Sequence, residues 1–556
     1  MSDAPLMLGV SGLRGIVGES LTPEVAMRFA ATFGSGLRQR SSLSTVIVGR
    51  DGRYGGEGIY HAAISGLLSA GCDVIPVDVV MTPTLAVTVD ETSSVAGLMI
   101  TASHNPGDWN GLKLLLTDEI KWPESDEDPN HELTRRLIGT DGAAAPPVGV
   151  ANDIILAFQH HQPILQPAVR VRSIRSYLSS VYPDPMNAHV HKVWSAVVID
   201  LRHEYDDRHR DRPMDAMQEM GRGCKKWRVI LDSVNASGGP GAESLIRSFH
   251  AEAIQLHGDS SGIFPHNPEP TAENLSGKGG LCDAVPGLRA DVGFAQDPDG
   301  DRLAIVDETG RYIGEEYTLV LAAISLLEAL GSPVLRTGSS ESAQSLGTGT
   351  SSERPSEQGQ GPSSESLATT TPLICVNLST SRMIDDVAAR YGARVVRTPV
   401  GEANVVEAMK RLRREGHHVL LGGEGNGGVI WPKVTYVRDS LSAMALTLSL
   451  MARTGKTISQ LVAGIPSYAI LKRKQPLARK ELAAPTVEKL AAHYRTKGPA
   501  VRVDTQDGVR IDFDDTRAWV HVRASNTEPI LRLIAEAPSV GIAEAVLEEV
   551  QRLVGE

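Results

Sequence analysis

The stretch Thr101-Ala102-Ser103-His104-Asn105-Pro106 decides the fold that we expect for this chain. It follows an apolar run at residues 95–100, which predicts a short buried strand. The Asn-Pro pair disfavours helix at Asn105 and predicts a turn. The serine hydroxyl is therefore expected on a loop at the carboxyl end of a strand, where open α/β sheets bind ligands. Taken alone, the stretch is equally consistent with an ordinary polar turn.

Length and composition limit the class of protein. At 556 residues the chain exceeds one hydrophobic core, and at roughly 100–200 residues per domain several domains are expected. Hydrophobic residues make up 41% and no uncharged run reaches transmembrane length, so no membrane partner is expected. Four scattered cysteines and an N-terminus unlike a signal peptide predict a reduced, cytoplasmic protein. The net charge of −12 disfavours nucleic acid as a partner but allows a small anion.

The first section, to about residue 170, alternates strand-like runs with helical stretches and predicts a mostly parallel sheet covered by helices. Two early loops carry arginine beside glycine, Ser11-Gly12-Leu13-Arg14-Gly15 and Gly49-Arg50-Asp51-Gly52-Arg53. This pairing suits phosphate, although each loop alone is better explained as a turn with a solvated arginine. Asn110-Gly111-Leu112-Lys113 predicts a glycine turn that returns a lysine towards Ser103.

A second α/β section carries an acidic loop. A strand at residues 290–295 leads into Asp297-Pro298-Asp299-Gly300-Asp301-Arg302, whose alternate carboxylates converge on one hard divalent cation. A solvated acidic turn and an EF-hand calcium loop are the alternatives, and the EF-hand is disfavoured because Arg302 stands where that loop needs glycine and because a strand, not a helix, is predicted to follow. Three carboxylates leave coordination sites open, which suits Mg²⁺ shared with a phosphate oxygen. Earlier in this section, the charge-dense residues near 195–225 indicate a solvated insertion rather than a metal site.

The third section repeats the α/β pattern, with an amphipathic helix predicted at residues 315–330. Residues 337–372 are rich in small polar residues and predict a disordered insertion. A strand at residues 418–421 then delivers Gly422-Gly423-Glu424-Gly425-Asn426-Gly427-Gly428. Glu424 and Asn426 suit hydrogen bonding to adjacent sugar hydroxyls, but the glycines fit a flexible loop without ligand equally well.

The last section changes to short strands separated by Asp-rich turns and closes with a helix, which predicts an antiparallel α+β unit. Its loop Arg523-Ala524-Ser525-Asn526-Thr527-Glu528-Pro529 offers a guanidinium, hydroxyls and backbone amides that would cradle a phosphate. The three preceding loops each follow a strand and are therefore expected to face one cleft. A serine, a cation site, a polyol-reading loop and a phosphate clamp together indicate phosphoryl transfer on a phosphorylated sugar.

Five motifs, in this order, resemble the α-D-phosphohexomutase family over nearly the whole chain apart from two insertions. They are Ser11–Gly15, Thr101–Pro106 with Asn110–Lys113, Asp297–Arg302, Gly423–Gly427 and Arg523–Pro529. The resemblance implies three stacked α/β domains with mixed, mostly parallel sheets and a C-terminal antiparallel α+β domain around a central cleft. The expected domains are 1–170, which bears phosphoserine; 171–310, which binds metal and has the insertion near 195–225; 311–460, which binds sugar and has the insertion 337–372; and 461–556, which binds phosphate.

The resemblance also implies the roles of individual residues. Ser103 is expected to carry a phosphoryl group, with one Mg²⁺ per chain held by its phosphate and by Asp297, Asp299 and Asp301. A hexose 1,6-bisphosphate is the implied intermediate and activator. The other implied residues are Arg14, His104 and Lys113 near the reacting oxygen, and Arg302, Glu424, Asn426, Arg523, Ser525, Asn526 and Thr527 for substrate. Lys113 is the candidate general acid or base, and His104 is expected to orient the loop.

The resemblance has departures that limit the choice of substrate. Many relatives have histidine where this chain has Gly428, so no proton-transfer role is carried over to that position. The GGEGNGG form looks most like bacterial phosphoglucosamine mutases, so glucosamine 6-phosphate is the expected substrate, with mannose or glucose phosphate as the main alternative. A sugar phosphatase and a catalytically silent sugar-phosphate binder are the remaining alternatives. The sequence leaves a monomer and a homodimer equally open.

Overall fold

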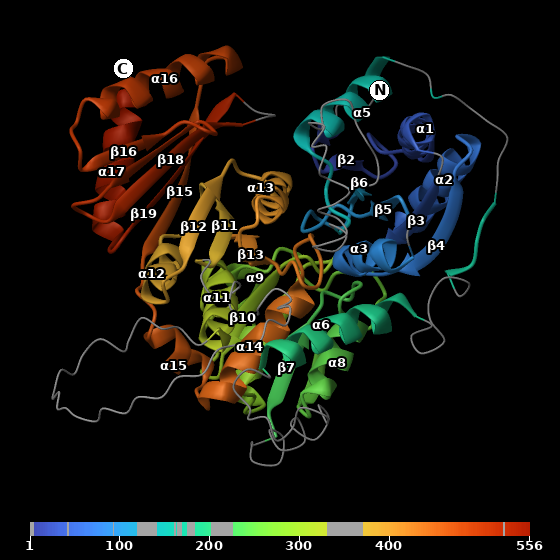
Figure 1. Ribbon diagram of the computed structural model, residues 1–556, viewed down its shortest axis with the longest axis horizontal. Coiled ribbons are helices and arrows are strands. Elements are labelled where there is room, and N and C mark those ends of the chain that lie inside the picture. Colours follow the sequence, from blue (N-terminus) through green and yellow to red (C-terminus); the bar gives the residue numbers. More distant parts are fainter. Residues whose placement is uncertain are drawn as a thin grey trace, which may run out of the picture.

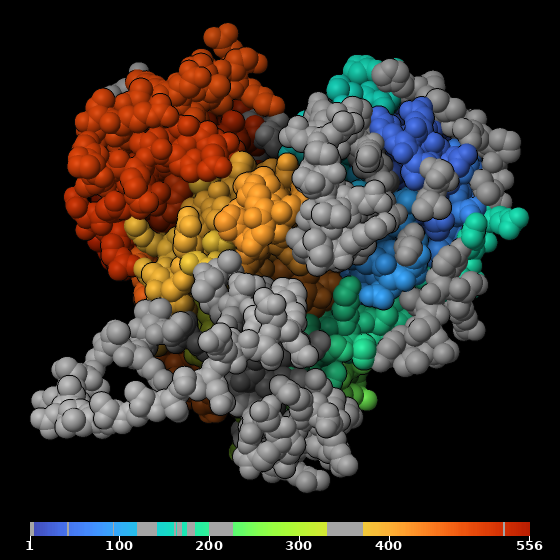
Figure 2. Space-filling model, viewed as in Figure 1, coloured from blue at the N-terminus to red at the C-terminus, as the bar shows by residue number. Residues whose placement is uncertain are grey.

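The computed structural model describes residues 5–41, 44–92, 94–118, 142–160, 163, 170–174, 184–201, 226–330, 371–525 and 529–555. These residues form four β-sheets, in chain order, each with its own helices (Figure 1). Figure 2 shows the N-terminal unit in blue and the C-terminal unit in red on either side of the third unit, which is yellow to orange. The predicted insertion at 337–372, but for its last two residues, lies outside the described residues, as do Asn526 and Thr527.

The first sheet has six strands in the order β1-β2-β6-β5-β3-β4. Its centre, β4-β3-β5, is parallel, and β6, β2 and β1 add antiparallel strands at one side. Along β3 the side chains alternate between two cores: Val46 and Val48 face one and Ile47 the other. The elements are β1 (Met7–Gly9), β2 (Gly12–Ile16), α1 (Pro23–Arg40), β3 (Thr45–Arg50), α2 (Gly56–Ser69), β4 (Asp73–Val79), α3 (Thr82–Glu91), β5 (Ala96–Ile100), β6 (Trp109–Leu116) and α5 (Val148–His160).

Two glycine-marked segments of this unit are strands and not the predicted loops. Arg14 lies within β2, and Gly111 and Lys113 lie within β6. A Cβ on Gly111 would lie 2.4 Å from the carbonyl oxygen of Leu13 and 2.7 Å from that of Thr101. Glycine is therefore required at position 111 by the close approach of neighbouring backbone, which a local turn rule misreads.

The second and third sheets have four strands each, in the orders β10-β9-β7-β8 and β12-β11-β13-β14. Each has two parallel pairs and one antiparallel edge strand. The elements are α6 (Pro185–Leu201), β7 (Arg228–Asp232), α8 (Gly239–Ser248), β8 (Glu252–His257), α9 (Ala272–Leu275), α10 (Leu281–Gly287), β9 (Val292–Gln296), β10 (Leu303–Asp307), α11 (Glu315–Ala329), β11 (Leu373–Asn377), α12 (Met383–Arg390), β12 (Arg394–Thr398), α13 (Glu402–Arg414), β13 (Val419–Glu424), β14 (Gly428–Ile430), α14 (Ser440–Thr454) and α15 (Ile458–Ala463).

One apolar core joins these two units. Helix α14 packs on α11 of the third unit and on α6 and α8 of the second, as its orange ribbon among green elements shows (Figure 1). Asp439 caps α14, accepting from the backbone amides of Leu441 at 2.9 Å and Ser442 at 3.1 Å. The predicted insertion near 195–225 starts too early, because α6 continues to Leu201 and buries Val197 in this core. Residues 202–225 lie outside the described residues.

The fourth sheet is antiparallel throughout, in the order β15-β19-β18-β17-β16, as predicted. Helices α16 and α17 bury one apolar face against it. The sequence analysis missed β15 and α16. The elements are β15 (Ala469–Pro476), η5 (Lys480–Leu482), α16 (Ala483–Arg495), β16 (Val501–Asp504), β17 (Val509–Phe513), β18 (Ala518–Ala524), β19 (Ile530–Ala537) and α17 (Val540–Gly555). Within the described ranges, every helix is too short or too polar to span a bilayer.

Candidate active site

The loop after β5 presents the hydroxyl of Ser103. Ser103 has a φ of +51°, in the left-handed region that only a constrained non-glycine residue adopts. Its backbone amide donates to Thr101 Oγ1 at 2.8 Å, and the Thr101 hydroxyl donates to Asp51 Oδ2 at 2.7 Å. The turn is thus held by side chains from two strands, and this fixes the direction of the serine hydroxyl.

A buried arginine holds the same loop from behind. The Arg53 guanidinium pairs with Asp51 at 2.8 Å and donates to the carbonyl oxygens of Trp109, at 2.7 Å, and Ser103. It is 1% exposed, so the expectation of a solvated arginine at this turn is wrong. The reason is that a tight loop leaves carbonyl oxygens without backbone donors, and the five N–H groups of arginine supply them.

The three aspartates of the acidic loop lie beside Ser103 and are completely buried. Their carboxylates lie close enough to hold one ion, with one oxygen of each within 4.8 Å of the others. Ser103 Oγ donates to Asp297 Oδ2 at 2.8 Å. One oxygen of Asp299 and one of Asp301 are buried without a hydrogen-bond partner, which fits a cation ligand set. Burial, then the charges of Asp301 and Asp299, raise the pKa of Asp297 well above its usual range.

Two cations neutralise the acidic loop. Lys113 Nζ lies 2.9 Å from Asp301 Oδ2 and 3.6 Å from Asp299 Oδ2, and Arg438 Nη2 lies 2.6 Å from Asp301 Oδ2. Burial by itself would lower the pKa of Lys113, but the nearby carboxylates raise it above its ordinary value. Lys113 is therefore a charged proton holder. Ser103, the three aspartates, Lys113 and Arg438 are called the acidic centre below.

Arg438 links the acidic loop to the glycine-rich loop, and the sequence analysis missed it. Besides Asp301, it pairs with Glu424 at 2.9 Å and Glu402 at 3.2 Å. A Cβ on Gly428 would lie 2.2 Å from Arg438 Cδ. The arginine therefore occupies the space that a side chain at position 428 would need. No motif marks this arginine in the sequence, because residues 429–441 also carry the charged Lys433 and Asp439.

Arg14 and His104, predicted near the reacting oxygen, and Arg302, predicted to bind substrate, lie around the same centre. Arg14 Nη1 donates to Asn105 Oδ1 at 3.1 Å, on the Ser103 loop. Burial, then Arg302 and Arg14, lower the pKa of His104 to about 3, so the imidazole is neutral. The amide of Arg302 donates to Asp297 Oδ1 at 3.1 Å and its guanidinium Nε lies 3.9 Å from Asp301 Oδ1.

A cavity of about 660 Å³ lies between the third and fourth units. It brings together three residues that the sequence singled out, Glu424, Asn426 and Arg523. Two further groups of basic side chains were missed, from β15 and β19. The lining residues used below are Glu316, Asn377, Glu424, Asn426, Lys472, Arg523 and Arg532.

The carboxylate of Glu424 is held on both sides at the rim of this cavity. Asn377 Nδ2 donates to its Oε1 at 2.8 Å, as does the amide of Gly401 at 3.2 Å. Asn426 Nδ2 lies 3.5 Å from Oε2, and Asn426 Oδ1 accepts from the Gly428 amide at 3.3 Å. The glycine-rich segment is thus an ordered strand end that aims Glu424, and not a flexible loop.

The clamp expected in the C-terminal unit is described in part. Arg523 Nη1 lies 3.8 Å from Asp507 Oδ2, and its Nε is buried without a hydrogen bond. Ser525 is buried, and its amide donates to the carbonyl of Ile530 at 3.0 Å, which closes the hairpin. Asn526 and Thr527 lie outside the described residues. A guanidinium with unused donors that faces a cavity can hold an anion.

Comparison with known families gives four matches in chain order. They are the phosphoglucomutase/phosphomannomutase alpha/beta/alpha domains I at residues 5–134, II at 214–310 and III at 363–468, and the C-terminal domain at 474–553. A phosphoglucomutase/phosphomannomutase of Thermococcus kodakarensis is 31% identical, over 98% of this chain and 97% of the relative. A "probable phosphoglucosamine mutase" of Methanopyrus kandleri is also 31% identical, over 97% and 96%.

Solved structures share the fold. A phosphoglucomutase/phosphomannomutase family protein from Burkholderia thailandensis aligns with a TM-score of 0.67 at 22% identity, covering 99% of this chain and 98% of the other. The open form of a phosphoglucomutase from Paramecium aligns with a TM-score of 0.63 at 15% identity, covering 99% and 97%. The four-unit arrangement is thus shared along the whole chain.

Proposed function

The chain belongs to the phosphoglucomutase/phosphomannomutase family of phosphohexomutases, and we propose that it interconverts glucosamine 6-phosphate and glucosamine 1-phosphate through a phosphoryl group carried on Ser103. The proposal rests on the 2.8 Å hydrogen bond between the Ser103 hydroxyl and Asp297 in the acidic loop, whose three aspartates are fully buried. It joins a nucleophile from the first unit to a candidate cation site of the second. The proposal needs both groups at one place, because phosphoryl transfer is mostly positioning and charge stabilisation.

In this mechanism the Ser103 Oγ–phosphorus bond breaks as a sugar hydroxyl oxygen forms the new bond to phosphorus, giving a bound 1,6-bisphosphate. The bisphosphate turns end for end, and its other phosphoryl group moves to Ser103 Oγ. The proton that the sugar hydroxyl loses is balanced by the proton that the released Ser103 Oγ gains, and Lys113, which holds a proton at Nζ, is the candidate acid for the departing oxygen. Arg14 steadies the serine loop through Asn105.

The acidic loop fits one Mg²⁺, which Asp297, Asp299 and Asp301 would hold together with the phosphate on Ser103. When bound, the cation would offset negative charge on the transferring group. The fit rests on the two buried carboxylate oxygens, on Asp299 and Asp301, that have no hydrogen-bond partner. Lys113, paired with Asp299 and Asp301, and Arg438, paired with Asp301, offset negative charge at this loop.

The cavity between the third and fourth units would hold the other end of the substrate. Lys472, Arg523 and Arg532 offer cationic donors for the non-reacting phosphate, while Glu424 and Asn426 face the sugar. Ser525, Asn526 and Thr527 are the proposed partners of Arg523 in this clamp. Arg302 is proposed to reach the phosphate from the acidic loop.

Glucosamine is the proposed sugar because a carboxylate, Glu424, lies where an amine of the substrate could be read, and because several relatives carry the phosphoglucosamine mutase description. Mannose or glucose phosphate is the second candidate, favoured by the description of the Thermococcus relative. Glu424 discriminates weakly between these sugars, because its carboxylate can accept a hydrogen bond from a hydroxyl as well as from an amine.

A coupled mutase assay tests the proposal. Protein with phosphate confirmed on Ser103 is given Mg²⁺, a trace of each matching hexose 1,6-bisphosphate, and glucosamine, glucose or mannose 6-phosphate. Glucosamine phosphate is expected to have the highest kcat/KM. A preference for glucose or mannose phosphate would retain the mechanism and reject the sugar. No turnover of any substrate by the phosphorylated protein would reject the mechanism.

A further inference from the structure

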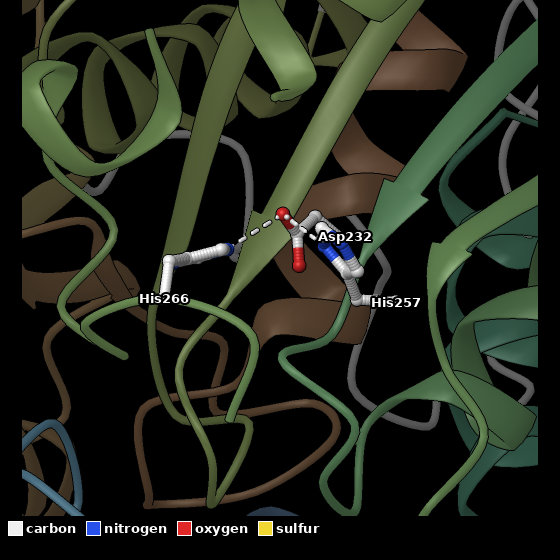
Figure 3. A group of neighbouring side chains, drawn as sticks. All are labelled: Asp232, His257 and His266. Carbon is white, nitrogen blue, oxygen red and sulfur yellow. Dashed lines mark hydrogen bonds and ion pairs between the residues drawn. The ribbon is translucent and has the colours of Figure 1, made fainter. Parts of the chain in front are cut away.

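A second cluster of metal-ligating side chains lies in the second unit, separate from the acidic loop. Asp232 ends β7, His257 ends β8, and His266 comes from the loop that follows β8. Figure 3 shows a nitrogen of each imidazole directed at one carboxylate oxygen. His257 Nδ1 lies 3.1 Å and His266 Nε2 lies 2.9 Å from Asp232 Oδ2. We propose that these three residues bind one transition-metal ion of the zinc class.

The donor set argues for this class of metal. Two imidazole nitrogens and one carboxylate oxygen suit Zn²⁺, Co²⁺ or Ni²⁺, whereas Mg²⁺ and Ca²⁺ prefer oxygen ligands alone. Tetrahedral ligands at about 2.0–2.1 Å from zinc lie about 3.3 Å from one another. The two nitrogen–oxygen separations of 3.1 and 2.9 Å lie within a few tenths of an ångström of that spacing. All three ligand atoms lie within 4.8 Å of one another.

The hydrogen bonds around the cluster orient its rings towards an ion. His266 Nδ1 lies 2.8 Å from the carbonyl oxygen of Asn267, which accepts the Nδ1 proton. In neutral His266 the Nε2 lone pair then faces Asp232, as in metal sites where the second ring nitrogen donates to a carbonyl. Asp232 is held as well, because its Oδ1 accepts from the Val234 amide at 3.1 Å.

Protonation alone does not account for the whole cluster. A proton on His266 Nε2 would satisfy that contact with Asp232. That proton would not satisfy His257 Nδ1, which is buried and makes no hydrogen bond although it lies 3.1 Å from the same oxygen. One cation between the three groups would serve all of them. Asp232 is 1% exposed, while the imidazole side chains are 25% and 19% exposed, which leaves a fourth position open to water.

The ion would fasten the loop after β8, which touches the first unit beside the serine loop. The carbonyl of Gly262 accepts from the Tyr54 amide at 3.0 Å. The Phe264 ring lies 5.4 Å from the guanidinium carbon of Arg53, the residue that holds the Ser103 loop. Metal at Asp232 would therefore stiffen the junction between the unit that bears Ser103 and the unit that bears the acidic loop.

Cobalt provides the test, because four-coordinate Co²⁺ absorbs visible light far more strongly than six-coordinate Co²⁺ held by oxygen. The full-length protein, stripped by a chelator and returned to excess Mg²⁺, is titrated with Co²⁺. We expect one equivalent to produce the intense band and to raise the thermal unfolding midpoint by about a few degrees. His257→Gln and His266→Gln should each lose the band. His417→Gln, at an exposed histidine on another unit, should keep it.

Two further variants separate the possible outcomes. Asp299→Asn should keep the intense band, because that residue belongs to the acidic loop. Asp232→Asn should lose it while the apo protein keeps a cooperative unfolding transition. No intense band in the folded wild type, or an undiminished band in both histidine variants, would overturn the proposal and leave a hydrogen-bonded cluster. Loss of the band in Asp299→Asn alone would assign the cobalt to the acidic loop and overturn it as well.

Discussion

The acidic centre and the cavity between the third and fourth units use cations in opposite ways. In the acidic centre, Lys113 and Arg438 are buried and already paired with carboxylates. In the cavity, the ion pair of Arg523 with Asp507 is long, at 3.8 Å, and its Nε has no hydrogen bond within the described residues, although Lys472 nearby pairs with Glu315 at 2.9 Å.

This contrast shows two different roles for cationic side chains. A region that must keep three carboxylates together needs its cations fixed in advance, since buried like charges repel. A region that receives an anion needs donors that are not yet used. Burial raises the pKa of Glu316, which lines the cavity, well above its usual range, and this favours the neutral form of that carboxyl on the receiving side.

The largest effect is expected from removing the phosphoryl carrier. Ser103→Ala should lower kcat by about 10⁴-fold or more, because no group remains to carry the phosphoryl group between the two sugar oxygens. Sugar-phosphate affinity, measured by calorimetry, should change little, because the cavity is untouched. Ser65→Ala, which removes a hydroxyl bonded only to its own exposed helix, is the matched control. Turnover by Ser103→Ala at the wild-type rate would show that the acidic centre does not carry the phosphoryl group on Ser103.

The next effect tests whether Arg438 holds the acidic centre together. Arg438→Met should lower the free energy of unfolding by about 3–5 kcal/mol, because it leaves Asp301, Glu402 and Glu424 without their shared cation. Urea unfolding measures this change. Arg411→Met removes an exposed pair with Glu415 and should cost under about 0.5 kcal/mol. An equal loss of unfolding free energy in the two variants would show that Arg438 does not hold the acidic centre together.

A smaller effect is expected at the cavity. Arg523→Ala should raise KM about 10–100-fold and change kcat little, since a charge-assisted hydrogen bond contributes about 1.5–3 kcal/mol. Steady-state kinetics with the best sugar phosphate measure both constants. Arg502→Ala, an exposed arginine of the same unit paired with Asp514, should change neither. A fall in kcat at unchanged KM would instead place Arg523 in the reaction.

The sequence predicts the parts of the site that obey local rules. A polar loop after a buried strand identified Ser103, the acidic loop and Glu424, and the structure brings the first two within 2.8 Å. The same local reading fails at Gly111, because the demand for glycine there comes from the backbones of Leu13 and Thr101.

The missed residues act across long sequence separations. Arg438 contacts Asp301, 137 residues earlier, and Arg53 donates to the carbonyl of Ser103, 50 residues later. Arg438 stands in no motif, and Arg53 stands in the arginine–glycine loop but contacts Ser103 instead of solvent, because packing gives each arginine its partners. The cluster of Asp232, His257 and His266 is similar: its members meet because β7 and β8 are parallel neighbours. Spacing along the chain does not reveal such a pairing.

The smallest effect concerns acid sensitivity at the cavity side. His521 on β18 is completely buried, with Nδ1 2.8 Å from Ser379 Oγ and Nε2 2.7 Å from the carbonyl of Asp507. Burial chiefly, with Arg510 and Arg523, lowers its pKa to about 4. The unfolded chain binds a proton near pH 6.5 and the folded chain does not, so stability falls as pH drops from about 6.5 towards 4.

Between pH 7.5 and 5.5 this single histidine should remove about 1.4 kcal/mol of stability, and His521→Gln should abolish that part of the pH dependence. Hydrogen exchange of the β18 amides, which reports local opening, measures it, with His417→Gln as an exposed control. An equal loss in wild type and His521→Gln would mean that the imidazole titrates as it does in water.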